Sequence, residues 1–337
     1  MFLNPQFKLE KRIWGFNFLR RHKYGPYLLY YLSIDIIDST RFKTTYKNKK
    51  ESSSSWSHQF KIFFEDVDKY LTKAYRNYND TVKVSFPFKW RIIGDEIVYF
   101  SEIYDIQDIL GHVLIAINFI KEFNSMENPL KIKISSWLAG FPVNNALFYT
   151  KDEKELRKNN RQRISNYETI NFLGPYIDAG FRIANYSTIN KYVISVDLAL
   201  VLLILKNKED TGAKELEFYF DKEKLTKGIN KGKYPIIWIN IGSDDSITFL
   251  LEKSNPCCAT KLSEYCKDYM KKHDIYVPFI FEKEDTFFKP SKKYELEYDK
   301  VIQLLEFNEQ SYIEDENRID TSGQNKLNKI DMKDIFK

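Results

Sequence analysis

The stretch that decides the fold is "YLSIDIIDSTRFK", residues 31–43. Apart from a serine and Asp35, its first half is apolar, which predicts a buried strand over residues 28–37. A short polar turn, 38–40, follows this strand. Because a buried carboxylate costs several kcal/mol unless a cation or hydrogen-bond donors meet it, the sequence predicts a partner for Asp35.

The segments after this strand predict further strands and helices. Apolar residues at helical spacing indicate helices, and apolar runs bounded by turn residues indicate strands. In chain order, the expected elements are a strand at 28–37, a polar loop at 44–57, a helix at 57–76, strands at 82–93 and 96–101, a helix at 106–120 and a strand at 130–135. This β-α-β-β-α-β order is typical of a ferredoxin-like unit, so we predict an α+β fold, an α/β sandwich.

In such a unit the third strand lies between the first two and is antiparallel to both. The end of the first strand then lies beside Asp95, in the tight turn Gly94-Asp95 between the second and third strands. At about 4 Å and an effective dielectric constant of about 20, Asp35 and Asp95 would repel by roughly 4 kcal/mol, so a divalent cation is expected between them. Ligands that are all oxygen favour Mg²⁺ or Mn²⁺. The alternative is that these residues only end a strand or cap the next element, as Asp38 can.

Composition excludes several classes of protein. The chain has 337 residues, 43% of them hydrophobic and 16% aromatic, enough for one large domain with a core. Its net charge of +5 is too small for a protein that coats nucleic acid, and suits a small anionic ligand. The histidines form no zinc motif, and the three cysteines indicate reduced thiols. The N-terminus lacks a signal peptide's apolar core, and the longest apolar run, 192–205, is too short for a membrane span and contains Asp197. We therefore expect a soluble, cytoplasmic protein without a nucleic-acid or membrane partner.

Four segments resemble motifs of the class III nucleotide cyclases, the adenylate and guanylate cyclase family. They are the first-strand motif "SIDIIDSTRF", the Gly-Asp hairpin "RIIGDEIVYF", the segment "GPYIDAGFR" at 174–182 and the late hairpin "LTKGINKGKYPIIWI" at 225–239. They occur in the family's order. The "STxFK" ending and the "IDxGFR" segment look closest to one branch, the bacterial pyrimidine cyclases of Pycsar anti-phage defence.

This resemblance implies a division of the chain. Residues 28–250 would form a cyclase catalytic domain, which is a ferredoxin-like unit with extra strands. Residues 1–27 would precede it. A partly helical extension, 251–337, would follow and end in a polar segment, 313–337, that we expect to be mobile.

The resemblance also implies which residues bind metal and phosphate. Asp35 and Asp95, with the carbonyl of Ile36, would hold two Mg²⁺ or Mn²⁺ ions per active site. Backbone amides from Ile36 to Thr40 would cradle phosphates, as helix N-termini do. Lys227 would hold the β- and γ-phosphates of a nucleoside triphosphate.

Four further residues would serve catalysis and base selection. Arg182 would meet negative charge on the α-phosphoryl group. Asp178 replaces the family's Asn, and would either accept from a sugar hydroxyl or pair with Arg182 one helical turn on. Arg91 and Asn171 occupy the positions that read the base, and match neither purine pattern. Arg donates to a carbonyl oxygen and Asn both donates and accepts, which favours UTP over CTP.

The expected product is a 3′,5′-cyclic monophosphate, released with pyrophosphate. Family members share their sites across a head-to-tail homodimer, and a separate effector protein would respond to the product. Three alternatives stay open. The chain can be a catalytically silent nucleotide-binding module, a purine (ATP or GTP) cyclase, or a palm-type nucleotidyltransferase, which shares the element order.

Overall fold

The computed structural model describes residues 26–47, 56–79, 84–150, 169–208, 212–225, 233–242, 255–278 and 290–305. The chain forms two compact units, Met1–Lys289 and Pro290–Lys337, and the described part of the second contains a helix at 292–305. The predicted boundaries at 27 and 250 stay predictions. Lys227 and the predicted mobile segment 313–337 lie outside the described residues. Within the described ranges, no helix combines the length and apolar character needed to cross a membrane.

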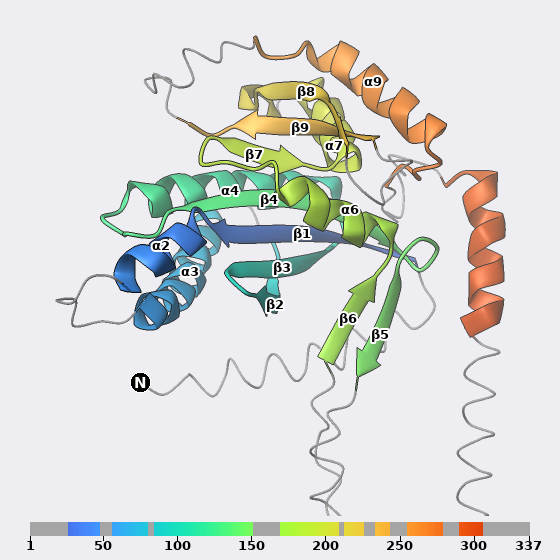
Figure 1. The fold of residues 1–337 in the computed structure, drawn as a ribbon. Helices are drawn as coiled ribbons and strands as arrows, with labels where there is room; N and C mark the ends of the chain where they lie inside the picture. Colours follow the sequence, from blue (N-terminus) through green and yellow to red (C-terminus); the bar gives the residue numbers. More distant parts are fainter. Residues whose placement is uncertain are drawn as a thin grey trace, which may run out of the picture. The chain divides into compact units, whose positions relative to one another are not determined.

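Seven of the described strands form one sheet, in the order β2-β3-β1-β4-β7-β9-β8 (Figure 1). Their bounds are β1 Tyr27–Ile36, β2 Phe88–Ile93, β3 Glu96–Ile103, β4 Ile132–Phe141, β7 Lys191–Ile194, β8 Phe218–Leu225 and β9 Lys233–Asn240. β3 lies between β1 and β2 and is antiparallel to both, and β4 lies antiparallel on the other side of β1. The predicted ferredoxin-like order and the α+β fold are confirmed. β7, β9 and β8 extend the sheet beyond β4.

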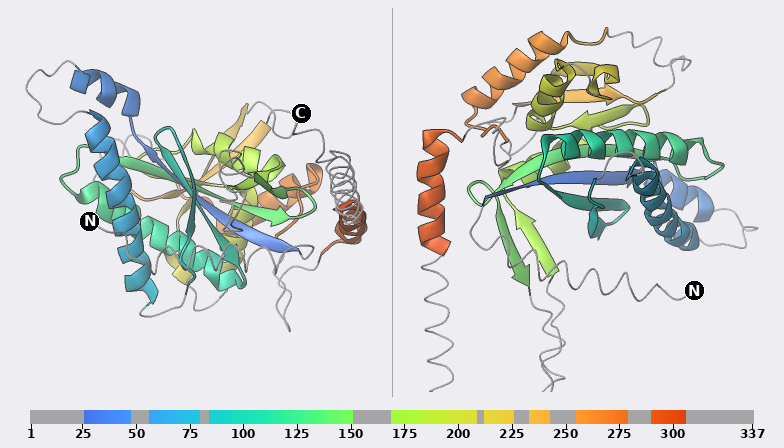
Figure 2. Two further views of the ribbon diagram at one scale, coloured as in Figure 1. Left: turned by 90° about the horizontal axis from the view of Figure 1, so that it is seen from below. Right: turned by 180° about the vertical axis from the view of Figure 1, so that it is seen from behind.

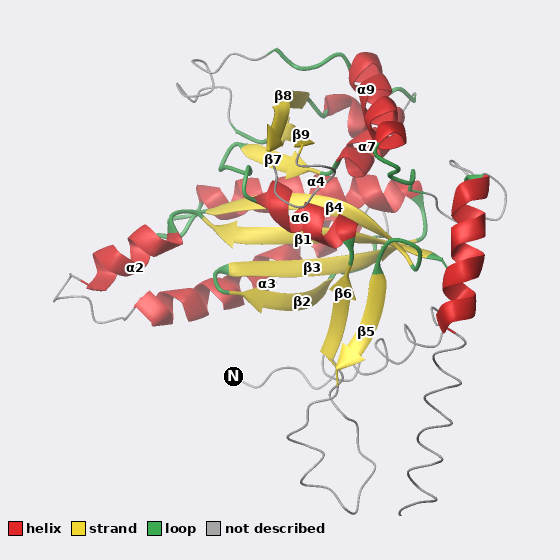
Figure 3. Ribbon diagram, turned by 45° about the vertical axis from the view of Figure 1, so that its right-hand side comes forward, coloured by secondary structure: helices red, strands yellow, loops and turns green. Residues whose placement is uncertain are grey.

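Helices lie on both faces of this sheet (Figures 1 and 2). Their bounds are α2 Ser39–Lys47, α3 Trp56–Asn79, α4 Ile106–Ser125, α6 Pro175–Ala184, α7 Val196–Lys206, the short 3₁₀ helix η1 Gly212–Glu215 and α9 Ala259–Lys272. α3, α4 and α7 share the large core on one face, whereas α6 lies on the other and contributes Ile177 to a smaller core, although its Ala179 and Ile183 join the large core. A separate two-stranded sheet, β5 (Ala146–Thr150) with β6 (Thr169–Leu173), extends away from the main sheet beside α6 (Figure 3).

Some element bounds differ from the prediction. Residues 44–47 belong to α2, so the predicted loop is wrong there. The ring of Phe42 lies 6.2 Å from that of Phe60 in α3, and the Thr44 hydroxyl donates to the Arg41 carbonyl at 2.8 Å. Packing and local hydrogen bonding therefore outweigh the polar composition of this segment.

The bounds of two strands, β2 and β4, also differ from the prediction. β2 begins at Phe88 rather than at 82. β4 continues to Phe141 instead of ending at 135, because residues 134–139 are all buried and the alternation that marks a half-buried strand is lost.

Side chains of β1 alternate between the two faces of the sheet. Leu32 and Ile34 join the core beneath α3, α4 and α7. Tyr31 packs in a smaller core on the opposite face, and the alternation directs Ser33 and Asp35 to that side. We call this side the Asp35 face.

The smaller core on the Asp35 face is aromatic. Tyr31 stacks on Trp137 of β4 with ring centroids 5.3 Å apart, and Phe172 of β6 packs edge-on against Tyr31 at 5.6 Å. Trp90 of β2 contacts Phe172 at 5.0 Å. These rings pack β6 against the sheet and form the surface against which α6 packs.

The larger core contains a buried histidine. His112 of α4 is fully buried, its Nδ1 lies 2.6 Å from the Tyr75 hydroxyl, and its ring stacks on Tyr30 at 4.9 Å. Burial lowers the pKa of His112 from 6.5 to about 3. The imidazole is therefore neutral in the folded protein at physiological pH.

We predict that His112 makes the fold sensitive to acid. The unfolded chain binds a proton on His112 below about pH 6.5, whereas the folded chain does so only near pH 3, so stability is lost as pH falls through this window. Between pH 7.5 and 4.5, the stability of wild type relative to His112→Gln should fall by about 2–3 kcal/mol. Denaturant unfolding of both proteins at each pH measures it. A difference that stays constant with pH would contradict the prediction.

Candidate functional site

Asp35 lies at the end of β1, beside the turn that carries Asp95. Its cross-strand neighbours are Glu96 in β3 and Lys133 in β4. Gly94 has φ of +65°, a conformation that favours glycine in a two-residue hairpin turn. The turn sets Asp95 directly before Glu96, close enough for its charge to raise the pKa of Asp35. The structure thus brings the two predicted metal ligands to one end of the sheet.

The direct partner of Asp35 is an ammonium group. Lys133 Nζ lies 3.2 Å from Asp35 Oδ2, and both side chains are largely buried. Burial raises the pKa of Asp35. The positive charge of Lys133 lowers this pKa, and the negative charge of Asp95 raises it further. Burial also raises the pKa of Glu96, whose Oε1 accepts a hydrogen bond from the Ser33 hydroxyl at 2.5 Å. Lys133 therefore pairs with Asp35 and also stabilises the Glu96 carboxylate, whereas the charge of Asp95 opposes ionisation of both.

Neither Lys133 nor Glu96 is among the site residues that the sequence predicts. The alternation over 130–135 places Lys133 on the polar side of its strand. Its position opposite Asp35 follows only from the register between β1 and β4. Glu96 follows the Gly-Asp turn directly, and this proximity is the one sequence signal that points to it.

The donor set around Asp35 suits a hard divalent cation that arrives with a phosphate. In the part of the chain that the structure describes, no group of three or more His, Cys, Asp or Glu side chains is arranged to hold a metal. Asp35 and Asp95 offer only oxygen ligands, and Mg²⁺ in phosphoryl-transfer sites uses one or two carboxylates together with substrate phosphates. The pair fits that pattern. The role of the Ile36 carbonyl stays a prediction.

The turn after β1 leads into the N-terminus of α2. The Ile37 amide donates to the Lys131 carbonyl at 2.9 Å, and the Ile36 amide donates to the Asp35 carboxylate. These two amides are therefore engaged within the chain, which narrows the predicted phosphate cradle to residues 38–40. The first amides of a helix lack an intrahelical acceptor, and Thr40 is exposed there.

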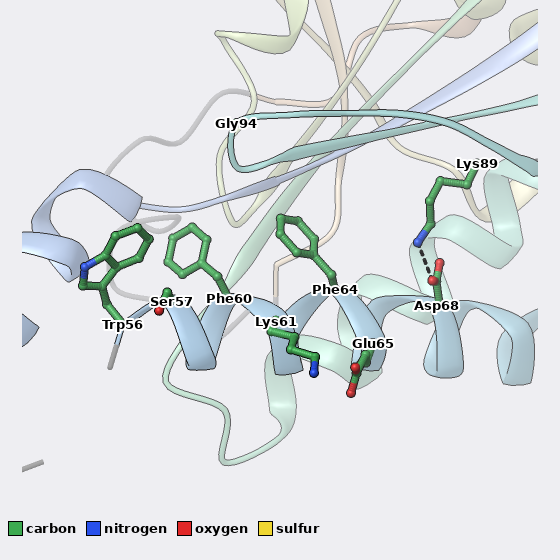
Figure 4. Close-up of a pocket in the computed structure, with 9 residues that line it drawn as sticks. All are labelled: Trp56, Ser57, Phe60, Lys61, Phe64, Glu65, Asp68, Lys89 and Gly94. Carbon is green, nitrogen blue, oxygen red and sulfur yellow. Dashed lines mark hydrogen bonds and ion pairs between the residues drawn. The ribbon is translucent and has the colours of Figure 1, made fainter. Parts of the chain in front are cut away.

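The β2–β3 hairpin is held from its other face by α3. Lys89 and the Tyr99 hydroxyl both donate to Asp68. Between α3 and the turn at Gly94 lies an open groove of about 470 Å³, into which Phe60 and Phe64 point (Figure 4). These contacts fix the hairpin that positions Asp95.

The two predicted base-reading positions meet, although they are 80 residues apart. Arg91 donates from Nη2 to Asn171 Oδ1. The guanidinium lies 4.9 Å from the centroid of the Trp90 ring, and the Trp90 indole N–H donates to the Ile170 carbonyl at 2.8 Å. Hydrogen bonds therefore tie β2 to β6 on the Asp35 face.

Arg182 belongs to α6, which lies very close to the sheet. Gly180 faces the Trp137 indole, and a Cβ added there would come within 2.1 Å of the ring.

The Arg182 side chain forms no hydrogen bond or ion pair with any described residue, and its Nε is buried. Asp178 is exposed, and among the described residues no ion pair joins it to Arg182. Both roles expected for Asp178 stay predictions. Lys227, which lies outside the described residues, falls between β8 and β9.

Comparisons with known proteins give structural but not sequence matches. No protein-family model matches the chain, and no curated protein matches it. The adenylyl cyclase CyaB from P. aeruginosa is similar with 11% identity and a TM-score of 0.44, over 66% of this chain and 98% of that chain. The guanylate cyclase domain of RhGC from Catenaria anguillulae, in complex with GTP, is similar with 12% identity and a TM-score of 0.44, over 64% of this chain and 97% of that chain. An adenylate cyclase from Trypanosoma brucei is similar with 8% identity and a TM-score of 0.41, over 65% of this chain and 91% of that chain.

We predict that Gly180→Ala destabilises the protein, because the added methyl group overlaps the Trp137 ring. Overpacking of this kind costs about 1–3 kcal/mol, or a fall in Tm of a few degrees. Gly140→Ala in β4 is the matched control, since a Cβ there meets nothing within 4 Å. Thermal unfolding of the three proteins measures the effect. Equal Tm values for Gly180→Ala and wild type would contradict the close approach of α6.

Proposed function

We propose that this chain is a nucleotide cyclase that converts a pyrimidine nucleoside triphosphate, UTP before CTP, into its 3′,5′-cyclic monophosphate and pyrophosphate. The observation that carries the proposal is the meeting of Asp35 and Asp95 at one end of the sheet, beside the N-terminus of α2. Paired oxygen ligands next to unpaired backbone amides suit a metal-bound triphosphate.

Each group in the site has a defined task. Two divalent ions, when bound to Asp35 and Asp95, would lower the pKa of the ribose 3′-hydroxyl and neutralise the triphosphate. The amides of residues 38–40 would orient phosphate oxygens. Arg182 would stabilise charge on the α-phosphoryl group, so Arg182→Ala should slow the reaction by about 10²–10³-fold. Lys227 would hold the outer phosphates, and Asp178 would accept from a ribose hydroxyl.

Base selection would fall to the Arg91–Asn171 pair. These residues lie together on the Asp35 face, and Trp90 supports the guanidinium. An arginine side chain only donates hydrogen bonds, which suits a carbonyl oxygen, and uracil has two carbonyl oxygens against one in cytosine. The pair therefore supports UTP as the preferred substrate, with CTP second.

The active site would be shared between two copies of the chain in a head-to-tail homodimer. Within one chain, the Arg182 side chain makes no hydrogen bond or ion pair with any described residue, so it is not held against Asp35 or Asp95. Ile92, Ile93 and Leu173 expose large apolar side chains on β2 and β6, which suits an interface. A role in anti-phage defence, through an effector that responds to the cyclic nucleotide, is supported by the motif resemblance.

Assay of the purified chain with ATP, GTP, CTP or UTP, each with Mn²⁺, tests the proposed reaction. Cyclic UMP should be the main product and cyclic CMP the second, and Asp95→Ala should form neither, because one metal ligand is lost. Chromatography of the products and pyrophosphate release provide the readout. Product from ATP or GTP alone would favour a purine cyclase. Binding without pyrophosphate release would favour a silent module.

Mixing two impaired variants tests the shared site. Asp35→Ala and Arg182→Ala should each have little activity alone, whereas a heterodimer of the two retains one site with both native residues. Turnover should therefore return on mixing, to about a quarter of wild type for random pairing of equal amounts. If no activity returns although both variants are folded and dimeric, the shared arrangement is wrong.

A further inference from the structure

Lys133 forms an ion pair with Asp35, the carboxylate that would bind the proposed metal. Its Nζ lies 3.2 Å from Asp35 Oδ2, and the two residues are direct cross-strand partners on the same face of the sheet. The Lys133 charge also lowers the pKa of Glu96. A divalent ion bound to Asp35 would repel this ammonium at close range. A divalent ion and Lys133 would therefore compete for Asp35.

The same lysine lies beside the proposed phosphate cradle. The Ile37 amide donates to the Lys131 carbonyl, which joins the turn before α2 to the start of β4, two residues from Lys133. Residues 38–40 follow this hydrogen bond directly. A lysine ammonium on a flexible four-carbon stem can turn from a carboxylate to a phosphate without a change in the backbone.

We infer that Lys133 is a positioning residue that exchanges partners when substrate arrives. In the nucleotide-free protein it neutralises Asp35 and keeps divalent ions out. When a metal-bound triphosphate enters, Asp35 would hold the metal and the Lys133 ammonium would turn to a triphosphate oxygen. The inference rests on the proposed nucleotide site, and it makes metal binding depend on nucleotide.

The test compares Lys133→Met with wild type, and with Lys191→Met as the matched control. Lys191 forms a similar half-buried pair with Asp221 at 3.6 Å, at the start of β7. Mn²⁺ binding without nucleotide is measured by electron paramagnetic resonance of free Mn²⁺. Binding of a non-hydrolysable UTP analogue with Mn²⁺ is measured by calorimetry. Thermal unfolding with and without Mn²⁺ shows that each variant is folded.

Lys133→Met should bind Mn²⁺ without nucleotide about tenfold more tightly than wild type, and its Tm should rise on addition of Mn²⁺. It should bind the UTP analogue about 10- to 100-fold more weakly, because one charge-assisted contact is lost. Lys191→Met should change neither affinity.

Two results would overturn the exchange. Unchanged or weaker Mn²⁺ binding by Lys133→Met would show that the lysine does not compete with metal. Tighter Mn²⁺ binding with unchanged nucleotide affinity would leave Lys133 only as a structural counter-ion. Failure of the proposed function is a different result, since a silent nucleotide-binding module would lack turnover in every variant and still show the exchange.

Discussion

An ionised Asp35 carboxylate on a strand as buried as β1 is costly unless positive charge or hydrogen-bond donors meet it. β1 lies between β3 and β4, so the residues opposite Asp35 are Glu96 on one side and Lys133 on the other. One neighbour repels the carboxylate and the other attracts it. Lys133 satisfies Asp35 within the chain, while Asp95 and Glu96 leave negative charge at the same end of the sheet. A divalent cation bound there would balance that excess negative charge.

The rest of the fold holds this end of the sheet in place. On one face, Asp68 of α3 accepts hydrogen bonds from Lys89 and Tyr99 and so braces the hairpin that carries Asp95. On the other face, Gly180 lets α6 lie directly on Trp137. Both supports lie on regular elements with buried contacts, and a catalytic arrangement needs such rigid elements to keep its geometry.

The sequence predicts the parts of this site that depend on local patterns. Apolar periodicity and the Gly94-Asp95 turn predict the β-α-β-β-α-β order, and that order brings Asp35 to Asp95. The Lys133–Asp35 pair is not predicted, because the register between β1 and β4 depends on packing between strands about 100 residues apart. The role of Asp178 is not decided by its local pattern, because i,i+4 spacing on a helix permits an ion pair with Arg182 without requiring one, and none joins the two among the described residues. The Arg91–Asn171 contact is not predicted either, since no local pattern joins these residues and the motif resemblance implies only that both read the base.

The central claim is that Asp35 and Asp95 bind a divalent ion together with a triphosphate. Anomalous diffraction from a crystal grown with Mn²⁺ and a non-hydrolysable UTP analogue tests it most directly. We expect Mn²⁺ peaks about 2.1 Å from carboxylate oxygens of both residues and from phosphate oxygens, with Lys133 turned away from Asp35. Peaks elsewhere, with Lys133 still paired to Asp35 while the analogue is bound, would contradict it.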